Sequence, residues 1–273
     1  MSSFETIIQQ IRACNPLVHH LTNYVTVNDC ANITLAIGGS PIMADAIQEV
    51  AEITAKTDAL VLNIGTLNEQ TVDSMILAGK EANKHGIPVI FDPVGVGISQ
   101  FRMDVTKKLL NSIHFTVIRG NYSEILCLAG IQTSAKGVDT SLVNQKKETE
   151  VINIARTLAS SFHCIIVITG AIDIVSDGVR TMQVKNGCAA MRHVTGTGCM
   201  LDSLIASFCG GYSDDFFEAA VSSVIAMGVA GELAFEKAKT KGTGSLRTHL
   251  IDEISKLTDQ TLSERGDYIA FDD

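Results

Sequence analysis

The segment 194–199, Val-Thr-Gly-Thr-Gly-Cys, has the residue types and spacing in this chain that are best suited to chemistry. It precedes an apolar stretch, predicted to be a helix, that continues to Ile205. Without Cβ atoms, Gly196 and Gly198 let the backbone bend so that successive N–H groups point into one small space. The helix adds the positive end of its dipole there. We therefore expect Gly196 and Gly198 to form a catalytic corner for a phosphate or a phosphoryl group in transfer.

Cys199 lies at the rim of this corner, where a kinase of small alcohols usually carries an acidic base. Two roles stay open for its thiol, that of a weak base and that of a spacer that leaves room for the alcohol. Because an ordinary thiol is mostly protonated at neutral pH, the spacer is favoured. A thiol hydrolase is an alternative, since helix N-termini favour thiolates. It needs a general base, and His193 is too close in sequence to be a dependable one.

A second set of polar residues follows two other apolar runs. In the segment 119–124, Asn121 is suited to cap a helix, and Glu124 three residues later is suited to complete the capping interaction. In the functional interpretation, Glu124 binds hydrated magnesium, directly or through water, and Arg119 binds a nucleotide phosphate. Asp92 supplies a second carboxylate. Mg²⁺ bound to phosphate needs only one or two such groups.

Four short apolar runs must position these residues, at 60–65, 89–93, 116–121 and 165–170. Their apolar residues are continuous rather than alternating, which is typical of parallel strands covered on both faces. The segment Glu69 to His85 between two of them is predicted to be a helix. Together they indicate an α/β fold with a mostly parallel central sheet and helices on both faces. Each run ends in polar residues, namely Asn63, Asp92, Arg119 with Asn121, and Thr169, at the edge where such sheets bind ligands.

The second half of the chain adds two elements. The segments 172–178 and 179–184 are predicted to form a hairpin with an Asp-Gly turn, placing an antiparallel edge beside the parallel sheet. The segment 214–239 is predicted to be a helix whose alanines and glycines pack tightly. We find no linker or repeat, so one domain over residues 1–273 is expected.

Composition excludes several classes of protein. A net charge of −9 argues against general binding to nucleic acid or to an anionic membrane. The longest apolar runs, 164–168 and 221–229, are too short or too interrupted to span a bilayer. The seven cysteines are an odd number and include no CxxC pair, so a zinc site is not expected. Most of them lie in apolar stretches, as reduced cytoplasmic thiols do. The segment 1–5 shows no export signal.

Taken together, the motifs resemble the hydroxyethylthiazole kinase family, over about residues 15–244. The order is Asn-Pro-Leu-Val-His, Leu-Thr-Asn, Gly-Ser-Pro-Ile-Met, Leu-Asn-Ile-Gly-Thr-Leu, Asp-Pro-Val-Gly-Val-Gly, Ile-Arg-Gly-Asn-Tyr-Ser-Glu, Ile-Thr-Gly and Thr-Gly-Thr-Gly-Cys. The resemblance implies a ribokinase-like fold and ATP- and Mg²⁺-dependent phosphorylation of 4-methyl-5-(2-hydroxyethyl)thiazole in thiamine salvage. It also implies a homotrimer with sites at subunit interfaces, and the cysteine usage favours a cytoplasmic location.

The same resemblance implies roles for individual residues. Cys199, Gly196 and Gly198 are expected at the catalytic centre, with substrate contacts at Asn23, Met43 and Gly196, ATP contacts at Arg119, Thr169 and Asn121, and magnesium at Asp92 and Glu124. Two positions differ from the family pattern. Asp202 stands where a neutral residue is expected, which leaves the local electrostatics open. Thr243 replaces the proline of Gly-Pro-Gly-Ser, a change expected to alter only a loop.

Two further alternatives remain besides the hydrolase. One is a nucleotide-binding regulator without chemistry, against which the full set of site residues counts. The other is a different ribokinase-like activity, such as hydroxymethylpyrimidine phosphorylation or ATP-dependent dehydration of a hydrated nicotinamide. The segments around Asn23 and Met43 match the thiazole enzyme and therefore favour the thiazole alcohol.

Overall fold

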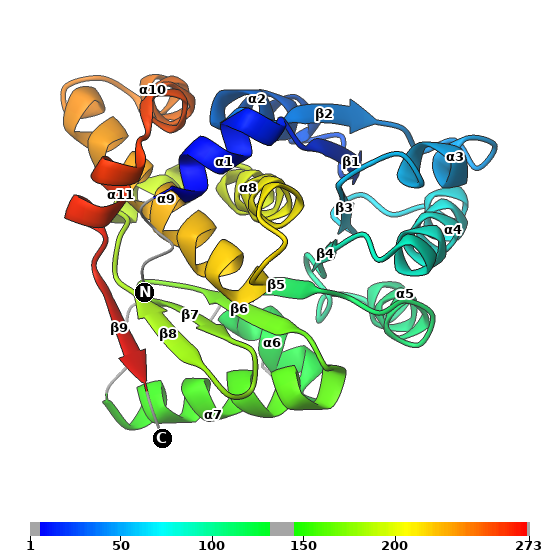
Figure 1. Ribbon diagram of the computed structural model, residues 1–273. Coiled ribbons are helices and arrows are strands. Elements are labelled where there is room, and N and C mark those ends of the chain that lie inside the picture. The colour runs from blue at the N-terminus through cyan, green and yellow to red at the C-terminus, as the bar shows by residue number, and fades with distance from the viewer. Residues whose placement is uncertain (1–5, 132–144, 272–273) are drawn as a thin grey trace.

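The computed structural model describes residues 6–131 and 145–271, so the expectation for residues 1–5 lies outside the described residues. Its centre is a nine-stranded sheet with the order β2-β1-β3-β4-β5-β6-β7-β8-β9 (Figure 1). The strands from β2 to β6 are parallel, and β7, β8 and β9 are antiparallel to their neighbours. The bounds are β1 Leu17–Leu21, β2 Ser40–Met43, β3 Ala59–Asn63, β4 Val89–Asp92, β5 Val117–Asn121, β6 Ile165–Thr169, β7 Asp173–Ser176, β8 Thr181–Val184 and β9 Tyr268–Phe271. The four predicted strands are thus confirmed as β3 to β6.

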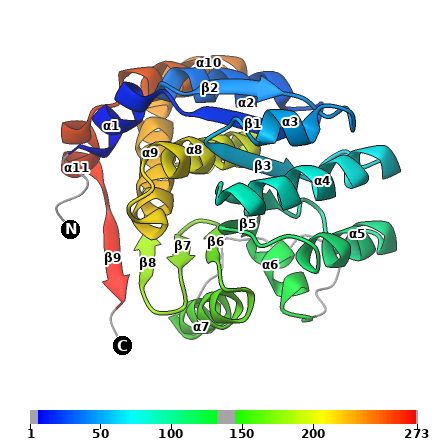
Figure 2. The ribbon, with the colours of Figure 1, turned by 45° about the vertical axis from the view of Figure 1, so that its right-hand side comes forward.

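Helices cover both faces of this sheet, as the continuous apolar strands predict (Figure 2). Val61 points into one core, while its neighbours Leu60 and Leu62 point into the other. The first core contains α1 Ile7–Cys14, α2 Val27–Ile37, α8 Thr197–Gly211, α9 Phe216–Ala238, α10 Thr243–Lys256 and α11 Asp259–Arg265. The second contains α3 Val50–Thr54, α4 Glu69–His85, α5 Gln100–Leu110, α6 Tyr122–Leu128 and α7 Gln145–Phe162. The short 3₁₀ helix Ala189–His193 leads into α8.

Helix α9 is longer than the apolar run that marks it in the sequence. Its 23 residues are long and apolar enough, by length and composition only, to cross a membrane, which the apolar run 221–229 alone does not indicate. However, 78% of its most apolar window is buried inside the fold, as in the core helix of a soluble protein. The predicted tight packing is confirmed, since a Cβ on Gly228 would lie 2.7 Å from the backbone carbonyl oxygen of Asn186.

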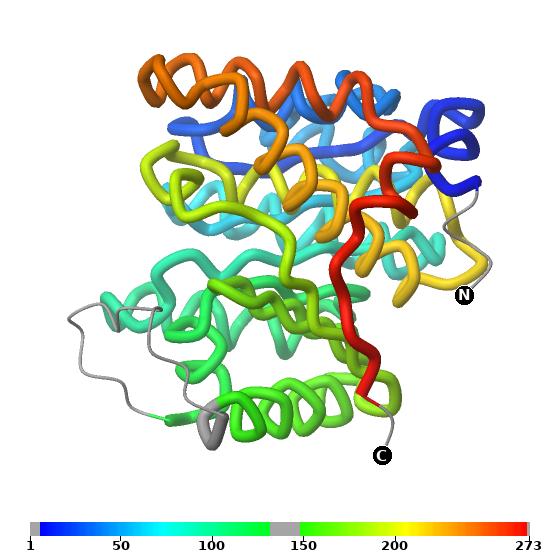
Figure 3. Tube along the Cα trace, turned by 90° about the vertical axis from the view of Figure 1, so that its left-hand side faces the viewer, coloured from blue at the N-terminus to red at the C-terminus, as the bar shows by residue number. Residues whose placement is uncertain are grey.

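The sequence did not predict β1, β2 and β9. Strand β1 is hard to recognise in the sequence because it contains two adjacent histidines, His19 and His20. Both histidines are buried. Each ring nitrogen of His19 has a hydrogen-bond partner, Thr54 Oγ1 at 2.9 Å and the Ala44 carbonyl at 2.7 Å. Burial lowers the pKa of His20 to about 4, so it is neutral at physiological pH. Figure 3 traces β9, in red, from α11 to the sheet edge beside β8. The predicted hairpin of β7 and β8 is confirmed, but β9 forms the outer edge.

The carboxyl ends of β1, β3, β4, β5 and β6 lie at one edge of the sheet because these strands are parallel. Helix α8 packs against β1, β3 and β4. Its first turn therefore lies where polar residues leave the strands.

Candidate active site

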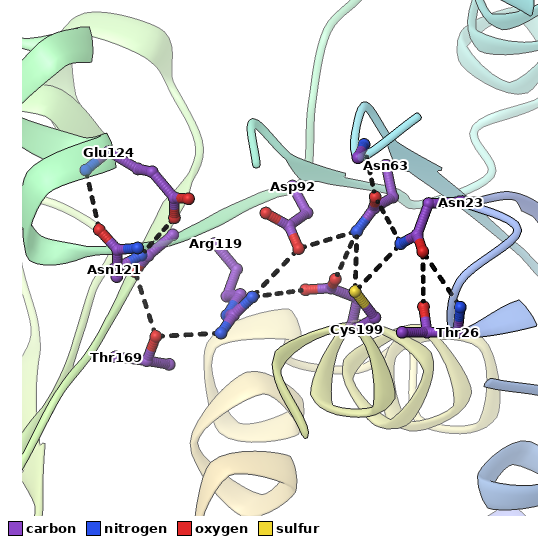
Figure 4. Close-up of polar contacts among 12 residues, drawn as sticks. Asn23, Thr26, Asn63, Asp92, Arg119, Asn121, Glu124, Thr169 and Cys199 are labelled. Carbon is purple, nitrogen blue, oxygen red and sulfur yellow. Dashed lines mark hydrogen bonds and ion pairs between the residues drawn. The ribbon is translucent and has the colours of Figure 1, made fainter. Parts of the chain in front are cut away.

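The guanidinium of Arg119 joins three of the predicted strand ends (Figure 4). Its Nη1 donates to Asp92 Oδ2 at 3.1 Å, and its Nη2 donates to Thr169 Oγ1 at 3.1 Å. Nη1 also lies 3.8 Å from Asp202 Oδ1, on α8. The predicted meeting of these side chains at one sheet edge is therefore confirmed.

Burial controls the ionisation of this group. Burial raises the pKa of Asp92 well above its ordinary value, and the negative charge of Asp202 raises it further. Burial likewise raises the pKa of Asp202 to about 6, although the charge of Arg119 opposes that shift. Burial alone would lower the pKa of Arg119, but both carboxylates raise it, so the guanidinium stays charged. The two carboxyl groups therefore compete for one buried cation.

We define the α8 corner as residues 196–199. Glycine is required at its positions 196 and 198 for different structural reasons. Gly196 is the N-cap of α8 with φ +85°, and a Cβ there would lie 2.6 Å from Thr26 Cγ2. A Cβ on Gly198 would overlap the guanidinium nitrogens of Arg119. Gly196 thus makes the turn, and Gly198 lets a cation lie against the first turn of the helix. In that first turn the N–H groups have no partner within the helix.

Two side-chain amides hold the sulfur of Cys199. Asn23 Nδ2 donates to Sγ at 3.2 Å and Asn63 Nδ2 at 3.4 Å. Asn23 Oδ1 in turn accepts from the N–H of Thr26 at 3.1 Å. Asn23 therefore positions Cys199, and its predicted contact with a substrate stays a prediction. The side chain of His193 is exposed and accepts a hydrogen bond from Arg192. Among the described residues, the hydrogen-bond partners of the Cys199 sulfur are the amides of Asn23 and Asn63, neither of which is the general base that a thiol hydrolase needs.

Met43 lies apart from the α8 corner but next to the same edge. It ends β2, where it pairs with His20 of β1. It lines a cavity of about 200 Å³ together with His20, Thr22, Tyr24, Val27, Ala44, Asp45, Thr66, Asn68 and Thr71. Neither Asn23 nor Cys199 lines this cavity. The pairing of β2 with β1 therefore places Met43 at the same edge of the sheet as Asn23, but Met43 lines a separate cavity that the sequence does not predict.

The residues predicted for magnesium fit a hydrated cation. Asp92 is fully buried, and its Oδ1 has no hydrogen-bond partner among the described residues. Glu124 Oε1 accepts from the N–H of Gly95 at 2.9 Å, in the loop that follows Asp92. These oxygens are the hard ligands that Mg²⁺ prefers.

The capping interpretation of the segment 119–124 is confirmed. Asn121 Oδ1 accepts from the N–H of Glu124 at 3.0 Å, and Glu124 Oε2 accepts from the N–H of Asn121 at 2.8 Å. The cap directs Glu124 toward the loop after β4, so the structural and functional interpretations are compatible. The ATP contact of Asn121 stays a prediction.

The sequence does not indicate the full roles of two site residues. In the sequence Asn63 is recognisable only as a strand end, yet it contacts Asp92, Cys199 and Asn23. Asp202 stands out only as a difference from the family pattern, yet it belongs to the buried charge cluster. Thr243, expected in a loop, is instead the first residue of α10 and exposed. Proline is well tolerated at that position, so threonine there is a local change.

The raised pKa of Asp202 predicts how stability depends on pH. The native carboxyl group holds its proton more tightly than the unfolded chain, whose aspartate pKa is about 3.9. Its protonation therefore stabilises the fold fully below that value, and this contribution is lost as pH rises through about 6. Asp202→Asn should accordingly gain in Tm relative to the unmodified protein between pH 5 and pH 7.5, measured by circular dichroism. Exposed Asp104→Asn is the control, and an equal Tm difference at both pH values for Asp202→Asn would contradict the prediction.

Comparison with known proteins agrees with this geometry. The family model described as hydroxyethylthiazole kinase family matches residues 8–260. A hydroxyethylthiazole kinase of Ruminiclostridium cellulolyticum is 50% identical over 260 residues, covering 95% of this chain and 94% of that protein. The solved structure of a hydroxyethylthiazole kinase protein from Pyrococcus horikoshii has a TM-score of 0.89 at 34% identity, covering 100% of both chains. A ribokinase-like superfamily protein of Enterococcus faecalis, with a TM-score of 0.61 at 12% identity over 91% of this chain and 88% of that one, shares the fold. The chain belongs to the hydroxyethylthiazole kinase family, with a ribokinase-like fold.

Proposed function

We propose that this protein transfers the γ-phosphoryl group of ATP to the hydroxyl of 4-methyl-5-(2-hydroxyethyl)thiazole, giving the thiazole phosphate used for thiamine. One observation carries the proposal. The α8 corner lies between Arg119, which packs on Gly198, and the amide of Asn23, which contacts Cys199. A phosphoryl group at the corner would thus have a cation on one side and the alcohol on the other.

The residues of the corner suit the charge that develops during transfer. A phosphoryl group passes through a loose transition state, so positioning and charge stabilisation contribute most. Open N–H groups at the start of α8 and the guanidinium of Arg119 supply positive charge. Asp92 and Thr169 hold that guanidinium in place. Because the alcohol need not be fully deprotonated before transfer, the residue at position 199 need not be a strong base such as a carboxylate.

Mg²⁺ is the proposed metal, held directly or through water by Asp92 and Glu124. When bound, it would neutralise negative charge on the phosphate groups during transfer. The Oδ1 of Asp92, for which the described part of the chain offers no hydrogen-bond partner, supports this assignment. In the protein alone, Arg119 balances the charge of Asp92.

A homotrimer with shared sites is proposed from the surface beside the cavity of Met43. Tyr24 lines that cavity and is 80% exposed, and neighbouring Val25 is 60% exposed. The two adjacent exposed apolar side chains form an apolar surface at the mouth of the cavity, which supports a subunit contact there. A heterologous contact repeated by threefold rotation would close a ring and cover each cavity. We also propose a cytoplasmic location, because all seven cysteines are free thiols.

The substrate is tested by ADP release in a coupled assay with saturating ATP and Mg²⁺. The thiazole alcohol should give turnover well above the rate without acceptor. Hydroxymethylpyrimidine should give much less, because we expect the cavity lined by Met43 to select the thiazole ring. Release with the pyrimidine alcohol alone would favour the other ribokinase-like activity. Nucleotide binding without release in either case would favour a regulator.

Assembly is tested with Val25→Glu, which places a charge in the proposed contact. We expect this variant to sediment as a monomer and to lose activity, since the cavity beside Met43 would lack its cover. Val179→Glu is the matched control, because Val179 is an exposed valine as well, at 80% against 60% for Val25, but lies between β7 and β8. A fully active monomer would rule out shared sites.

The role of Cys199 is tested by kcat of two variants at saturating ATP and Mg²⁺. For a spacer, Cys199→Ser should lose far less than the about 10²–10⁴-fold cost of removing a general base. Cys199→Asp should lose more than Cys199→Ser. Its carboxylate would join Asp92 and Asp202, which each have an oxygen within 4.8 Å of the sulfur, and like charges repel.

The double variant Cys199→Asp/Asp202→Asn separates repulsion from chemistry. It removes one carboxylate from the cluster and should recover part of the activity lost in Cys199→Asp. A thousandfold loss in Cys199→Ser would show instead that the thiol itself is required.

A further inference from the structure

The amide of Asn63 lies at the centre of the buried polar cluster. Asn63 ends β3 and is 2% exposed. Its Nδ2 lies 2.9 Å from Asp92 Oδ2, 3.4 Å from Cys199 Sγ and 3.4 Å from Asp202 Oδ2 (Figure 4). One neutral nitrogen thus faces two carboxylates and a sulfur.

The other end of the amide fixes its orientation. Oδ1 of Asn63 accepts from Asn23 Nδ2 at 3.0 Å and from the N–H of Gly65 at 2.9 Å. Exchanging Oδ1 and Nδ2 would set an oxygen against the Asp92 carboxylate and a nitrogen against two donors. Only one orientation satisfies all of these partners, so Asn63 links the Asn23 side of the site to the Asp92 side.

The three acceptors around Nδ2 have the spacing of a metal site. One ligand atom each from Asp92, Cys199 and Asp202 lies within 4.8 Å of the others. Thiolate and carboxylate ligands at such spacing suit Zn²⁺. The Asn63 nitrogen lies within 3.4 Å of one such atom of each of these three residues.

We propose that Asn63 is a positioning residue for phosphoryl transfer. Its amide takes the place of a cation, drawing Asp92, Cys199 and Asp202 together and excluding thiophilic metals. The positioning part rests on the proposed kinase function, since it sets the alcohol side of the corner in register with the phosphoryl side. Misplacement by about 1 Å far from the chemistry can cost about 100-fold in rate. The exclusion of metal is independent of the substrate.

The test replaces Asn63 with Ala, with Asn63→Ser as a second variant if the first does not fold. We expect kcat to fall about 100-fold while KM for ATP and for the alcohol changes only a few-fold. Removing the amide should also let Zn²⁺ bind at least tenfold more tightly than in the unmodified protein, measured by competition with a zinc indicator without substrate. Adding Cys199→Ser to the Asn63 variant should abolish that gain by removing the sulfur ligand.

Asn186→Ala is the matched control. Asn186 is also a buried amide, 8% exposed, and its bonds go to Glu232, Arg265 and Asp267, in another part of the fold. It should lose stability without gaining affinity for Zn²⁺ or changing kcat. A folded Asn63 variant with kcat within threefold of the unmodified protein would overturn the positioning role, and unchanged Zn²⁺ affinity would overturn the exclusion role. Absence of thiazole phosphorylation by the unmodified protein would count against the proposed function and, with it, the positioning role, whereas the Zn²⁺ measurement would still test the exclusion role.

Discussion

The buried charge of Arg119 is the constraint on which the site depends. Removing a guanidinium from water costs several kcal/mol unless acceptors replace its hydration. Here Asp92 of β4 and Thr169 of β6 accept hydrogen bonds from the guanidinium, and Asp202 of α8 places a carboxylate oxygen 3.8 Å from it. These groups surround the cation only when their elements are in register, so the parallel sheet and the position of α8 are both required. The same cation lies against Gly198, where any larger residue would displace it.

Helix α8 connects the core to the site. Its apolar residues, such as Leu204 and Phe208, are buried in the first core, while its first turn reaches the edge of the sheet. Cys199 and Asp202 lie one turn apart on it, so both point into the polar cluster. A site built on a buried helix and strand ends holds its geometry more precisely than one built on loops. The packing of both cores is thus what fixes distances in the site.

The cluster concentrates positive and negative groups in a chain whose overall charge is −9. An anionic ligand is not attracted by the whole molecule, so local groups must bind it. The start of α8 and Arg119 supply that local charge. Asn63 complements them, because a neutral amide can donate to two acids without adding a charge that would compete with Arg119 for them.

We could predict from the amino-acid sequence the parallel sheet, its four central strands and the polar residues at their ends, because continuous apolar runs and turn chemistry are local properties. The folded structure alone establishes which partners these residues have. It turned Asn23 toward Cys199, paired Asp202 with Arg119 and placed Asn63 among three acceptors. It also added β1, whose buried histidines look polar in sequence, and β9 at the edge. The partners of a buried polar group lie tens to hundreds of residues away in the chain. A single sequence therefore indicates that such groups meet at one edge, whereas packing decides which atoms bond.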